Sequence, residues 1–527
     1  MLKSLILPAT IATTLLSTSL YSSTSSAIEG TKATPVASVK VEKSTLSKSA
    51  QDVAEFAVKT YQHQMVESLA KLIKHNTVAV EGVKSTENPA HIAFKEELKR
   101  QALALGLDFT DHGYVLIVGL GNSEERVGII THGDVQPVNE NKWQKSPFDL
   151  DVTSEPGKLI GRGTEDDKGP IATAMYAMKA IKDNKLPLTK RLELYVYMAE
   201  ESDWDPLREY VKNNILPATN ITIDAEYPVV TAEKGYGTIA LTFPERKLNP
   251  MVKFERPYLS SFTGGFFNSQ IPEDAKAVIE NASFDLLQQL MSAAEQIDNV
   301  GFDFEFKDQQ LTITALGKSA HSSKPEDGIN AITHLAQLID FQKWPSNQSG
   351  MLVNFINQHL GTQLYGERFG EIAYENAFMG RMTVSPTVIK QTDKGVQLRI
   401  NLRRPVGKTA EQLEQEIAAT VKGWEQRNNT TLSDTSYKIG EPWVQKNAPH
   451  VDTLLSVFSH YTGIKNPQPV AIGGGTNSRL FPNAVSFGPS MPNTPYSGHS
   501  EHEFITMEQF VLNLRMYTAV MIELATK

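Results

Sequence analysis

Several short stretches of this 527-residue chain carry histidine or acidic residues of the kind that bind metal ions. They are His132 and Asp134 in THGDV, Asp166 and Asp167 in GRGTEDDKGP, Glu200 and Glu201 in YMAEES, Asp224 in TIDAEYP, and His499 in GHSEHE. Imidazole nitrogen and carboxylate oxygen suit zinc and similar divalent ions, and a pair of ions can share one bridging carboxylate. The chemistry predicted by this pattern is hydrolysis by a water molecule activated between two metal ions.

Hydrolysis of an amide also needs a carboxylate that takes a proton from the water and passes it to the leaving amine. Neighbouring side chains at the end of a strand point in different directions, so one of Glu200 and Glu201 can bind metal while the other faces the water. Taken singly, an acidic pair is more often a solvated surface, and Asp166–Asp167 could simply cap the following helix. Together, in compatible topology, these signals favour a metal site.

The elements that must position these residues alternate between strands and helices. Short apolar runs predict strands at 127–131, 191–199 and 220–223, and helical spacing predicts helices at 51–75 and after Pro170. This alternation favours an α/β fold with a mainly parallel sheet, whose sites lie at the carboxyl ends of the strands. The candidate residues that follow a strand are His132, Glu200, Glu201 and Asp224.

A different pattern begins near residue 236 and predicts an inserted α+β domain over 236–443. Alternating apolar and polar residues predict strands at 236–243, 310–320 and 394–406. Helical stretches are expected around 274–298 and 327–341. The α/β pattern returns near 444, where a helix ends at Gly463 before the GGGTNSR turn and the GHSEHE loop. The predicted catalytic domain is therefore discontinuous and consists of residues 51–235 and 444–527.

The first residues are typical of an export signal. Lys3 precedes a short apolar stretch, and Ser25 and Ala27 fit a small-x-small cleavage site. We predict a signal peptide over 1–27, cleaved near Ala27, and a flexible lead-in over 28–50. The mature protein is then expected in the periplasm, without a membrane attachment, because no later run is long and apolar enough to cross a bilayer.

Composition excludes several other classes of function. The formal net charge of −9 and the absence of a basic stripe argue against nucleic acid as a partner. Cysteine is absent, which rules out disulfides, thiolate metal ligands and a cysteine nucleophile. Any metal ion must therefore be held by imidazole and carboxylate.

The run from Thr131 to Gly235, joined by GGGTNSR and His499, resembles the co-catalytic dizinc peptidase family of glutamate carboxypeptidase, aminoacylase, carnosinase and dipeptidase V. The GTxDDKGP form, the PV–EKG sequence and the large insertion are most similar to the dipeptidase V and carnosinase branch. The resemblance covers the chain after about residue 50. It implies a zinc-peptidase catalytic domain with an inserted lid domain that closes over the substrate.

The resemblance also implies a ligand set for two divalent metal ions, with Zn²⁺ first and Co²⁺ or Mn²⁺ as alternatives. The set is His132 and Asp224 for one ion, Glu201 and His499 for the other, and Asp166 as the bridge. The peptide bond between Asp166 and Asp167 is expected to be cis.

The remaining roles follow from the same resemblance. Asp134 would orient His132, and Glu200 would be the general base. His321, in GKSAHSSKPEDGINA, would reach the reacting carbonyl, and Arg403, in NLRRP, would hold the substrate carboxylate. A histidine between alanine and serine is otherwise more often merely exposed.

This chain departs from the family pattern at two places. Asn401-Leu402-Arg403 stands where the family often has Asp-Ile-Arg, and an asparagine used for oxyanion contact is expected to be replaced near Ser385.

Three functions remain open on the sequence. The first is a zinc dipeptidase or related exopeptidase that cleaves short peptides. The second is an N-acyl amino acid deacylase or desuccinylase with the same site. The third is an exported peptide-binding protein without catalysis, which the predicted general base disfavours. We expect a monomer whose lid acts within one chain, with a dimer as the alternative.

Overall fold

The computed structural model describes residues 46–249 and 256–526. The predicted signal peptide and residues 28–45 of the predicted lead-in lie outside the described residues. Helix α1 (Lys48–Ile73) begins before its predicted start at 51, because the side chain of Ser47 accepts a hydrogen bond from the amide of Ala50 and caps the first turn. No helix among the described residues is long and apolar enough to span a membrane.

The first of two large sheets has nine strands in the order β1-β2-β5-β3-β6-β23-β8-β21, with β22 paired to β8. Its strands are β1 (Asp108–Asp111), β2 (Val115–Leu120), β3 (Arg126–His132), β5 (Arg191–Tyr197), β6 (Thr219–Thr222), β8 (Val230–Glu233), β21 (Trp443–Val444), β22 (Val470–Ile472) and β23 (Val485–Ser486). The central strands β5, β3, β6 and β23 run parallel, while β1, β2 and β21 pair antiparallel at the edges. The predicted α/β fold class is confirmed.

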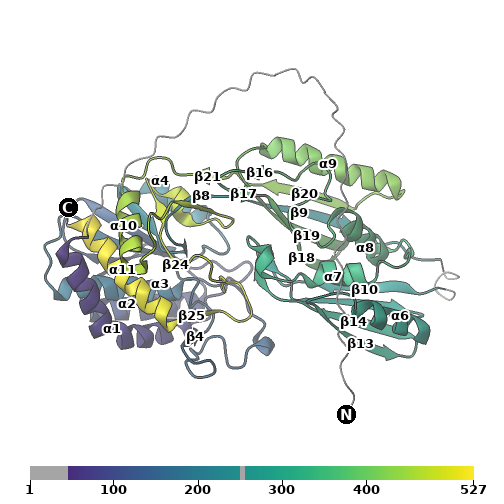
Figure 1. The fold of residues 1–527 in the computed structure, drawn as a ribbon, viewed down its shortest axis with the longest axis horizontal. Helices are drawn as coiled ribbons and strands as arrows, with labels where there is room; N and C mark the ends of the chain where they lie inside the picture. The colour runs from purple at the N-terminus through teal and green to yellow at the C-terminus, as the bar shows by residue number, and fades with distance from the viewer. Residues whose placement is uncertain (1–45, 250–255, 527) are drawn as a thin grey trace, which may run out of the picture. The chain divides into compact units, whose positions relative to one another are not determined.

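Helices cover this sheet and supply much of its core (Figure 1). They are α1, α2 (Pro89–Ala104), α3 (Lys168–Asp183), α4 (Asp205–Asn213), α10 (Val451–Thr462) and α11 (Met507–Ala525). Helices α1, α3 and α11 pack on one another although they lie far apart in the sequence. Met65, Met175 and Tyr517 of these helices are fully buried, so residues near both ends of the described chain share one core.

The second sheet has eight strands in the order β13-β14-β12-β10-β18-β19-β9-β20, and every neighbouring pair is antiparallel. Its strands are β9 (Gly235–Phe243), β10 (Tyr258–Gly264), β12 (Asp274–Glu280), β13 (Gly301–Lys307), β14 (Gln310–Leu316), β18 (Thr383–Thr392), β19 (Gly395–Arg404) and β20 (Asp434–Ile439). These strands occupy one continuous stretch of the chain, between β8 and β21. The exact domain boundaries at 236 and 444 stay a prediction.

The second sheet has its own core, built with the helices α6 (Phe284–Ala294), α7 (Ala331–Leu338), α8 (Gln348–His359) and α9 (Ala410–Arg427). The rings of Phe243, Phe355 and Trp424 meet edge to face at its centre. The helix predicted around 274–298 is wrong in its first part, which forms β12. There DAKAVIE alternates between buried and partly exposed residues, and β12 is paired on both sides.

The first sheet brings the predicted site residues to one edge. Strands β5, β3 and β6 are parallel neighbours, so their carboxyl ends lie together. His132 ends β3, Glu200 follows β5, and Asp224 follows β6. A two-stranded ladder between β4 (Lys158–Ile160) and β25 (Phe504–Thr506) brings the GHSEHE loop beside the GRGTEDD loop.

Candidate active site

Two overlapping groups of ligand-type side chains meet at this edge. One consists of His132, Asp166 and Asp224, and the other of Asp166, Glu201 and His499; within each group the ligand atoms lie within 4.8 Å of one another. Asp166 belongs to both groups. Its Oδ1 lies 2.9 Å from His132 Nε2, and its Oδ2 lies 3.1 Å from His499 Nε2. One carboxylate thus presents a separate oxygen to each group, as a bridging ligand does.

The electrostatics of the two groups suit bound cations. Burial alone lowers the pKa of His132, but the neighbouring carboxylates, Asp224 first, outweigh it and hold that pKa well above its ordinary value. For His499, burial is likewise outweighed by Glu201 and Asp166, and the pKa rises to about 10. Burial raises the pKa of Asp224 to about 6, although His132 opposes the change. Crowded carboxylates that favour positive charge on both imidazoles would equally favour divalent ions, and nitrogen and oxygen donors without thiolate suit zinc.

The segments that hold these groups include two unusual backbone conformations. The Asp166–Asp167 peptide bond is cis, as the resemblance implied. His499 has a φ of +65°, in the left-handed region that non-glycine residues rarely adopt. Asp167 occupies the N-cap position of α3 without forming a side-chain cap; its carboxylate instead accepts a hydrogen bond from Thr131. Although Asp167 stands at the N-cap position, its side chain does not cap the helix, as the alternative explanation for this acidic pair would require.

Asp134 holds the ends of two strands together. Its carboxylate accepts hydrogen bonds from the amides of Glu200 (3.0 Å) and Glu201 (3.1 Å). The ring nitrogen Nδ1 of His132 lies 3.0 Å from the backbone oxygen of Asp134 and 3.6 Å from its carboxylate. Because a fixed Nδ1 leaves Nε2 free for a metal ion, Asp134 can orient His132 and set the turn that carries both glutamates.

Glu200 and Glu201 leave the end of β5 in different environments. The Oε2 of Glu201 accepts a hydrogen bond from Gln136 at 2.8 Å, and its Oε1 lies 2.9 Å from His499 Nε2. Glu200 lines the adjacent cavity, and its Oε1 is buried without a hydrogen-bond partner among the described residues. Burial, reinforced by Asp224, holds the pKa of Glu200 well above its ordinary range. A buried carboxylate with a free oxygen is suited to accept a proton.

A buried ion pair fixes the loop that carries Asp166. The fully buried Glu503 accepts hydrogen bonds at Oε1 from the amides of Gly163, Glu165 and Asp166, at 2.9–3.1 Å. Its Oε2 accepts from Arg162 Nη1 at 2.7 Å. Arg162 Nη2 in turn donates to the backbone oxygens of Ser500 and Pro137. The loop of Asp166 and the loop of His499 are therefore held in one network.

We expect Glu503→Gln to weaken metal binding about 10- to 100-fold, the usual effect of losing a group that orients ligands. The amide leaves Arg162 buried without its acid, so we also expect the free energy of unfolding to fall by about 3–5 kcal/mol. Isothermal titration of metal-free protein with Zn²⁺ and thermal melting measure both effects.

Glu501→Gln is the matched control, because Glu501 lies in the same loop but accepts from Asn139 and Trp143 instead. Metal affinities that fall equally in the two variants would contradict the positioning role of Glu503.

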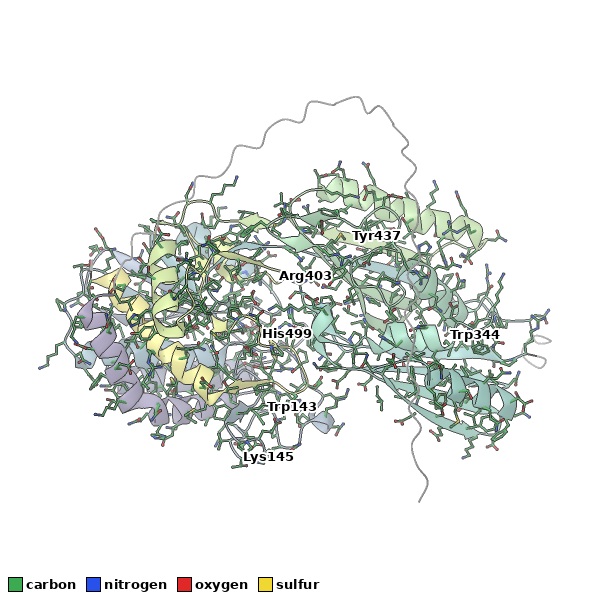
Figure 2. The ribbon with its side chains drawn as sticks, in the orientation of Figure 1. Trp143, Lys145, Trp344, Arg403, Tyr437 and His499 are labelled. Carbon is green, nitrogen blue, oxygen red and sulfur yellow. The ribbon has the colours of Figure 1, made fainter. Side chains whose placement is uncertain are left out.

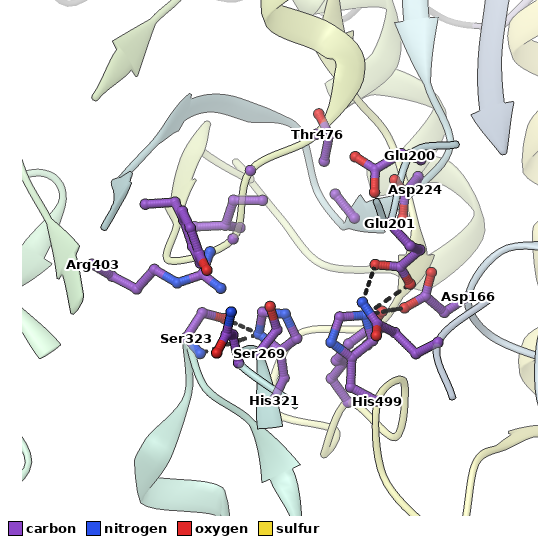
Figure 3. Close-up of a pocket in the computed structure, with 18 of the residues that line it drawn as sticks. Asp166, Glu200, Glu201, Asp224, Ser269, His321, Ser323, Arg403, Thr476 and His499 are labelled. Atoms are coloured by element: carbon purple, nitrogen blue, oxygen red, sulfur yellow. Dashed lines mark hydrogen bonds and ion pairs between the residues drawn. The ribbon is translucent and has the colours of Figure 1, made fainter. Parts of the chain in front are cut away.

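A cavity of about 610 Å³ lies against the two ligand groups and is also lined by residues of the second sheet and its loops. Arg403, from β19, and His499, from the loop before β25, both line it (Figure 2). Figure 3 shows Arg403 across the pocket from Asp166 and Glu201. The cavity thus places groups from both sheets around one space.

His321, at the end of β15 (Ala320–His321), lines this cavity as a neutral imidazole. Its Nδ1 accepts a hydrogen bond from the amide of Ser323 at 3.1 Å, and the hydroxyl of Ser323 lies 2.5 Å away. Burial, with His499 and Arg403 nearby, holds its pKa well below the ordinary value. Because Nδ1 is an acceptor, the ring proton is on Nε2, which makes Nε2–H a hydrogen-bond donor.

Arg403 is buried, with 3% of its surface exposed, and has no acidic partner within ion-pair distance among the described residues. Its guanidinium donates to Asn401 Oδ1, the backbone oxygen of Gly473 and Ser322 Oγ, and lies over the ring of Tyr236. Burial lowers its pKa to about 10, so the group stays charged at neutral pH. A buried cation without an acid in reach indicates an anionic ligand.

The position near Ser385, where the family asparagine is expected to be replaced, is not part of the cavity lining. Ser385 is a buried residue of β18, paired with Asn401 of β19, and does not line the cavity. Asn268 does line it, and its Oδ1 is buried without a hydrogen-bond partner among the described residues. Asn268 follows Gly265, whose φ of +77° turns the chain after β10. No local motif marks this asparagine, since its place depends on that turn.

Tyr496 is a second cavity residue that the sequence reasoning missed. Its hydroxyl donates to Asp166 Oδ2 at 2.6 Å, and its ring meets that of His321 edge to face, with centroids 5.9 Å apart. Its closeness to His499 in the sequence PYSGHS was the one available signal.

Comparisons with known proteins point to one family. The family model described as peptidase family M20/M25/M40 matches residues 128–523. A β-Ala-Xaa dipeptidase of Lactobacillus delbrueckii subsp. lactis is 30% identical over 413 residues, which cover 77% of this chain and 83% of that protein.

Two solved structures share the fold at 14% identity. The structure of human carnosine dipeptidase 1 has a TM-score of 0.55 and covers 92% of this chain and 100% of its own. That of the dipeptidase Dug1p from Saccharomyces cerevisiae has a TM-score of 0.54 and covers 90% and 98%.

Proposed function

Because the chain belongs to peptidase family M20/M25/M40, we propose that this metallopeptidase is a dipeptidase that cleaves short peptides with a free carboxyl terminus. The observation that carries the proposal is the buried guanidinium of Arg403, which faces the same cavity as both ligand groups and has no acid within ion-pair distance in the part of the chain that the structure describes. The name of the Lactobacillus relative supports the same class of substrate.

The proposed cofactor is a pair of divalent metal ions, with Zn²⁺ first and Co²⁺ or Mn²⁺ as alternatives. His132 and Asp224 would hold one ion, Glu201 and His499 the other, with Asp166 shared. Bound there, the ions would polarise the scissile carbonyl and lower the pKa of a water molecule.

Within this proposal, the residues of the chain divide the work of proton transfer and orientation. Glu200 takes the proton of the attacking water and later delivers it to the nitrogen of the leaving amine. Asp134 keeps Glu200 in place through the amide of that residue. The Oε1 of Glu200 has no hydrogen-bond partner among the described residues, so this oxygen is free to accept that proton.

His321 and Asn268 supply polar groups from the second sheet and its loops. The Nε2–H of His321 would donate to the carbonyl oxygen as negative charge develops on it, and a donor preorganised in this way stabilises the transition state. The amide of Asn268 lies in the same cavity and is a second candidate donor. Because one chain supplies both groups and both ligand sets, we propose that a monomer suffices.

We also propose that the enzyme is exported and acts in the periplasm. This part of the proposal is supported by the sequence of residues 1–27 alone.

The test of the function compares a free dipeptide with its carboxyl-amidated form. Wild-type protein loaded with Zn²⁺ should hydrolyse L-Ala-L-Ala, and Arg403→Ala should raise KM for it about 10- to 100-fold, because a charged hydrogen-bond pair is lost. The amidated dipeptide, which has no carboxylate, should be affected much less. Steady-state kinetics with both substrates measures the difference.

Arg404→Ala is the matched control, because Arg404 is also buried in β19 but pairs with Glu441 and does not line the cavity. Equal losses on the free and amidated substrates in Arg403→Ala would rule out the carboxylate-binding role. Faster cleavage of N-acyl amino acids than of any dipeptide would favour the deacylase instead.

A further inference from the structure

One acidic side chain of the cavity has no role in the chemistry proposed above. The acidic residues that line the cavity, among those the structure describes, are Asp166, Glu200, Glu201, Asp224 and Glu226. The first four are the proposed metal ligands and general base. Glu226 is the remaining carboxylate, and it belongs to neither ligand group.

The position of Glu226 is set by a short ladder next to the metal ligands. It lies two residues after Asp224, in β7 (Ala225–Glu226), which pairs in parallel with β24 (Pro489–Ser490). Residues two apart in an extended chain are separated by about 7 Å. If the scissile carbonyl of a substrate is held at the ligand groups, its free amino group is one or two carbon atoms away from that carbonyl. The carboxylate of Glu226 is then within reach of this amino group.

Glu226 already forms an ion pair with Lys324, which lies on the second sheet's side of the cavity. Lys324 Nζ lies 2.5 Å from its Oε2, and Lys324 follows His321 in the same turn. Both side chains are partly exposed, at 19% for Glu226 and 32% for Lys324. An ion pair this exposed rearranges at little cost. Since a carboxylate has about four acceptor positions, Glu226 can also accept a second ammonium group.

The cavity thus has one positive and one negative side chain that could each bind one charged end of a substrate. Over residues 46–249 and 256–526, Arg403 is a cation without an acid in ion-pair contact, and Glu226 is an acid outside the two ligand groups. We propose that Glu226 binds the free ammonium group of the substrate, so that the substrate class is the unblocked dipeptide rather than the N-acyl amino acid. This inference rests on the proposed function and adds the recognition of the amino end.

The competing explanation is that Glu226 has a purely structural role and only joins the two sides of the cavity through Lys324. A second lysine forms a similar ion pair between the part of the chain around the first sheet and the part around the second. Lys142, on the first sheet's side, pairs with Glu273 at 2.5 Å and with Asp274. Glu273 does not line the cavity of the ligand groups. Glu273→Gln therefore removes a comparable cross-sheet contact without removing an acid from the cavity, and it serves as the matched control.

The experiment compares L-Ala-L-Ala with propionyl-L-alanine, which has the same shape but a hydrogen in place of the amino group. For Zn²⁺-loaded wild type we expect kcat/KM to be at least about 10-fold higher for the dipeptide. Glu226→Gln should lower kcat/KM for the dipeptide about 10- to 100-fold and leave that for propionyl-alanine nearly unchanged. Glu273→Gln should leave the ratio between the two substrates as in wild type.

Each other outcome overturns a defined statement. If Glu226→Gln lowers both substrates equally, or if Glu273→Gln changes the ratio as much, Glu226 is structural and the inference fails while the dipeptidase stands. If wild type prefers propionyl-alanine, the unblocked substrate class is wrong. If loaded wild type cleaves neither compound, the proposed function itself fails, and the inference fails with it.

Discussion

Glu200→Gln is expected to lower kcat for L-Ala-L-Ala about 10²- to 10⁴-fold, the usual contribution of a general base. The amide matches the carboxylate in size but cannot carry the proton of the water to the leaving amine. The backbone contacts that hold the residue, from its amide to Asp134 and from Trp204 to its carbonyl oxygen, do not involve the side chain. Metal content and thermal midpoint should therefore stay close to those of wild type.

Glu201→Gln is the control that separates the loss of the general base from the loss of a metal ligand. It makes the same chemical change at the neighbouring residue, whose carboxylate contacts His499 and belongs to a ligand group. That variant should lose metal affinity as well as turnover. Near-normal turnover of Glu200→Gln with its metal ions bound would show that another group moves the proton.

The central part of the fold could be predicted from the sequence because local pattern and final environment agree. The strand predicted at 127–131 is β3, which is buried along most of its length between two parallel neighbours, so an apolar β-branched run is what its position requires. The secondary structure of residues 274–280 was harder to predict. Its small and apolar residues fit a helix as well as a strand, and its strand form is decided by pairing with β10 and β14, which no local pattern reveals.

The candidate site divides in the same way. Residues such as His132 and Glu200 stand in short motifs at or near the ends of strands, so their types and positions were visible in the sequence. Glu503 has no such signal, since its importance comes from amides and an arginine more than 330 residues away. Asn268 and Glu226 likewise become site residues only because the cavity walls come from both sheets. Contacts between distant segments are what the sequence left open.

The largest loss is expected for Asp166→Ala, because this side chain alone belongs to both ligand groups. Fully loaded wild type should hold about two metal ions per chain after gel filtration, as measured by inductively coupled plasma mass spectrometry. Asp166→Ala should hold almost none and have no measurable turnover. Removing the shared carboxylate takes one ligand oxygen from each group: Oδ1, which lies 2.9 Å from His132 Nε2, and Oδ2, which lies 3.1 Å from His499 Nε2.

A graded comparison separates a shared ligand from general damage to the site. His499→Ala should chiefly weaken one ion, because His499 belongs to a single group. His502→Ala, in the same loop, should keep both ions, since His502 is half exposed and pairs with Glu155 away from the cavity. One tightly bound ion in fully loaded wild type, or equal loss in the Asp166 and His499 variants, would contradict the bridge. The order of metal loss therefore tests the arrangement in which each oxygen of Asp166 faces a different histidine.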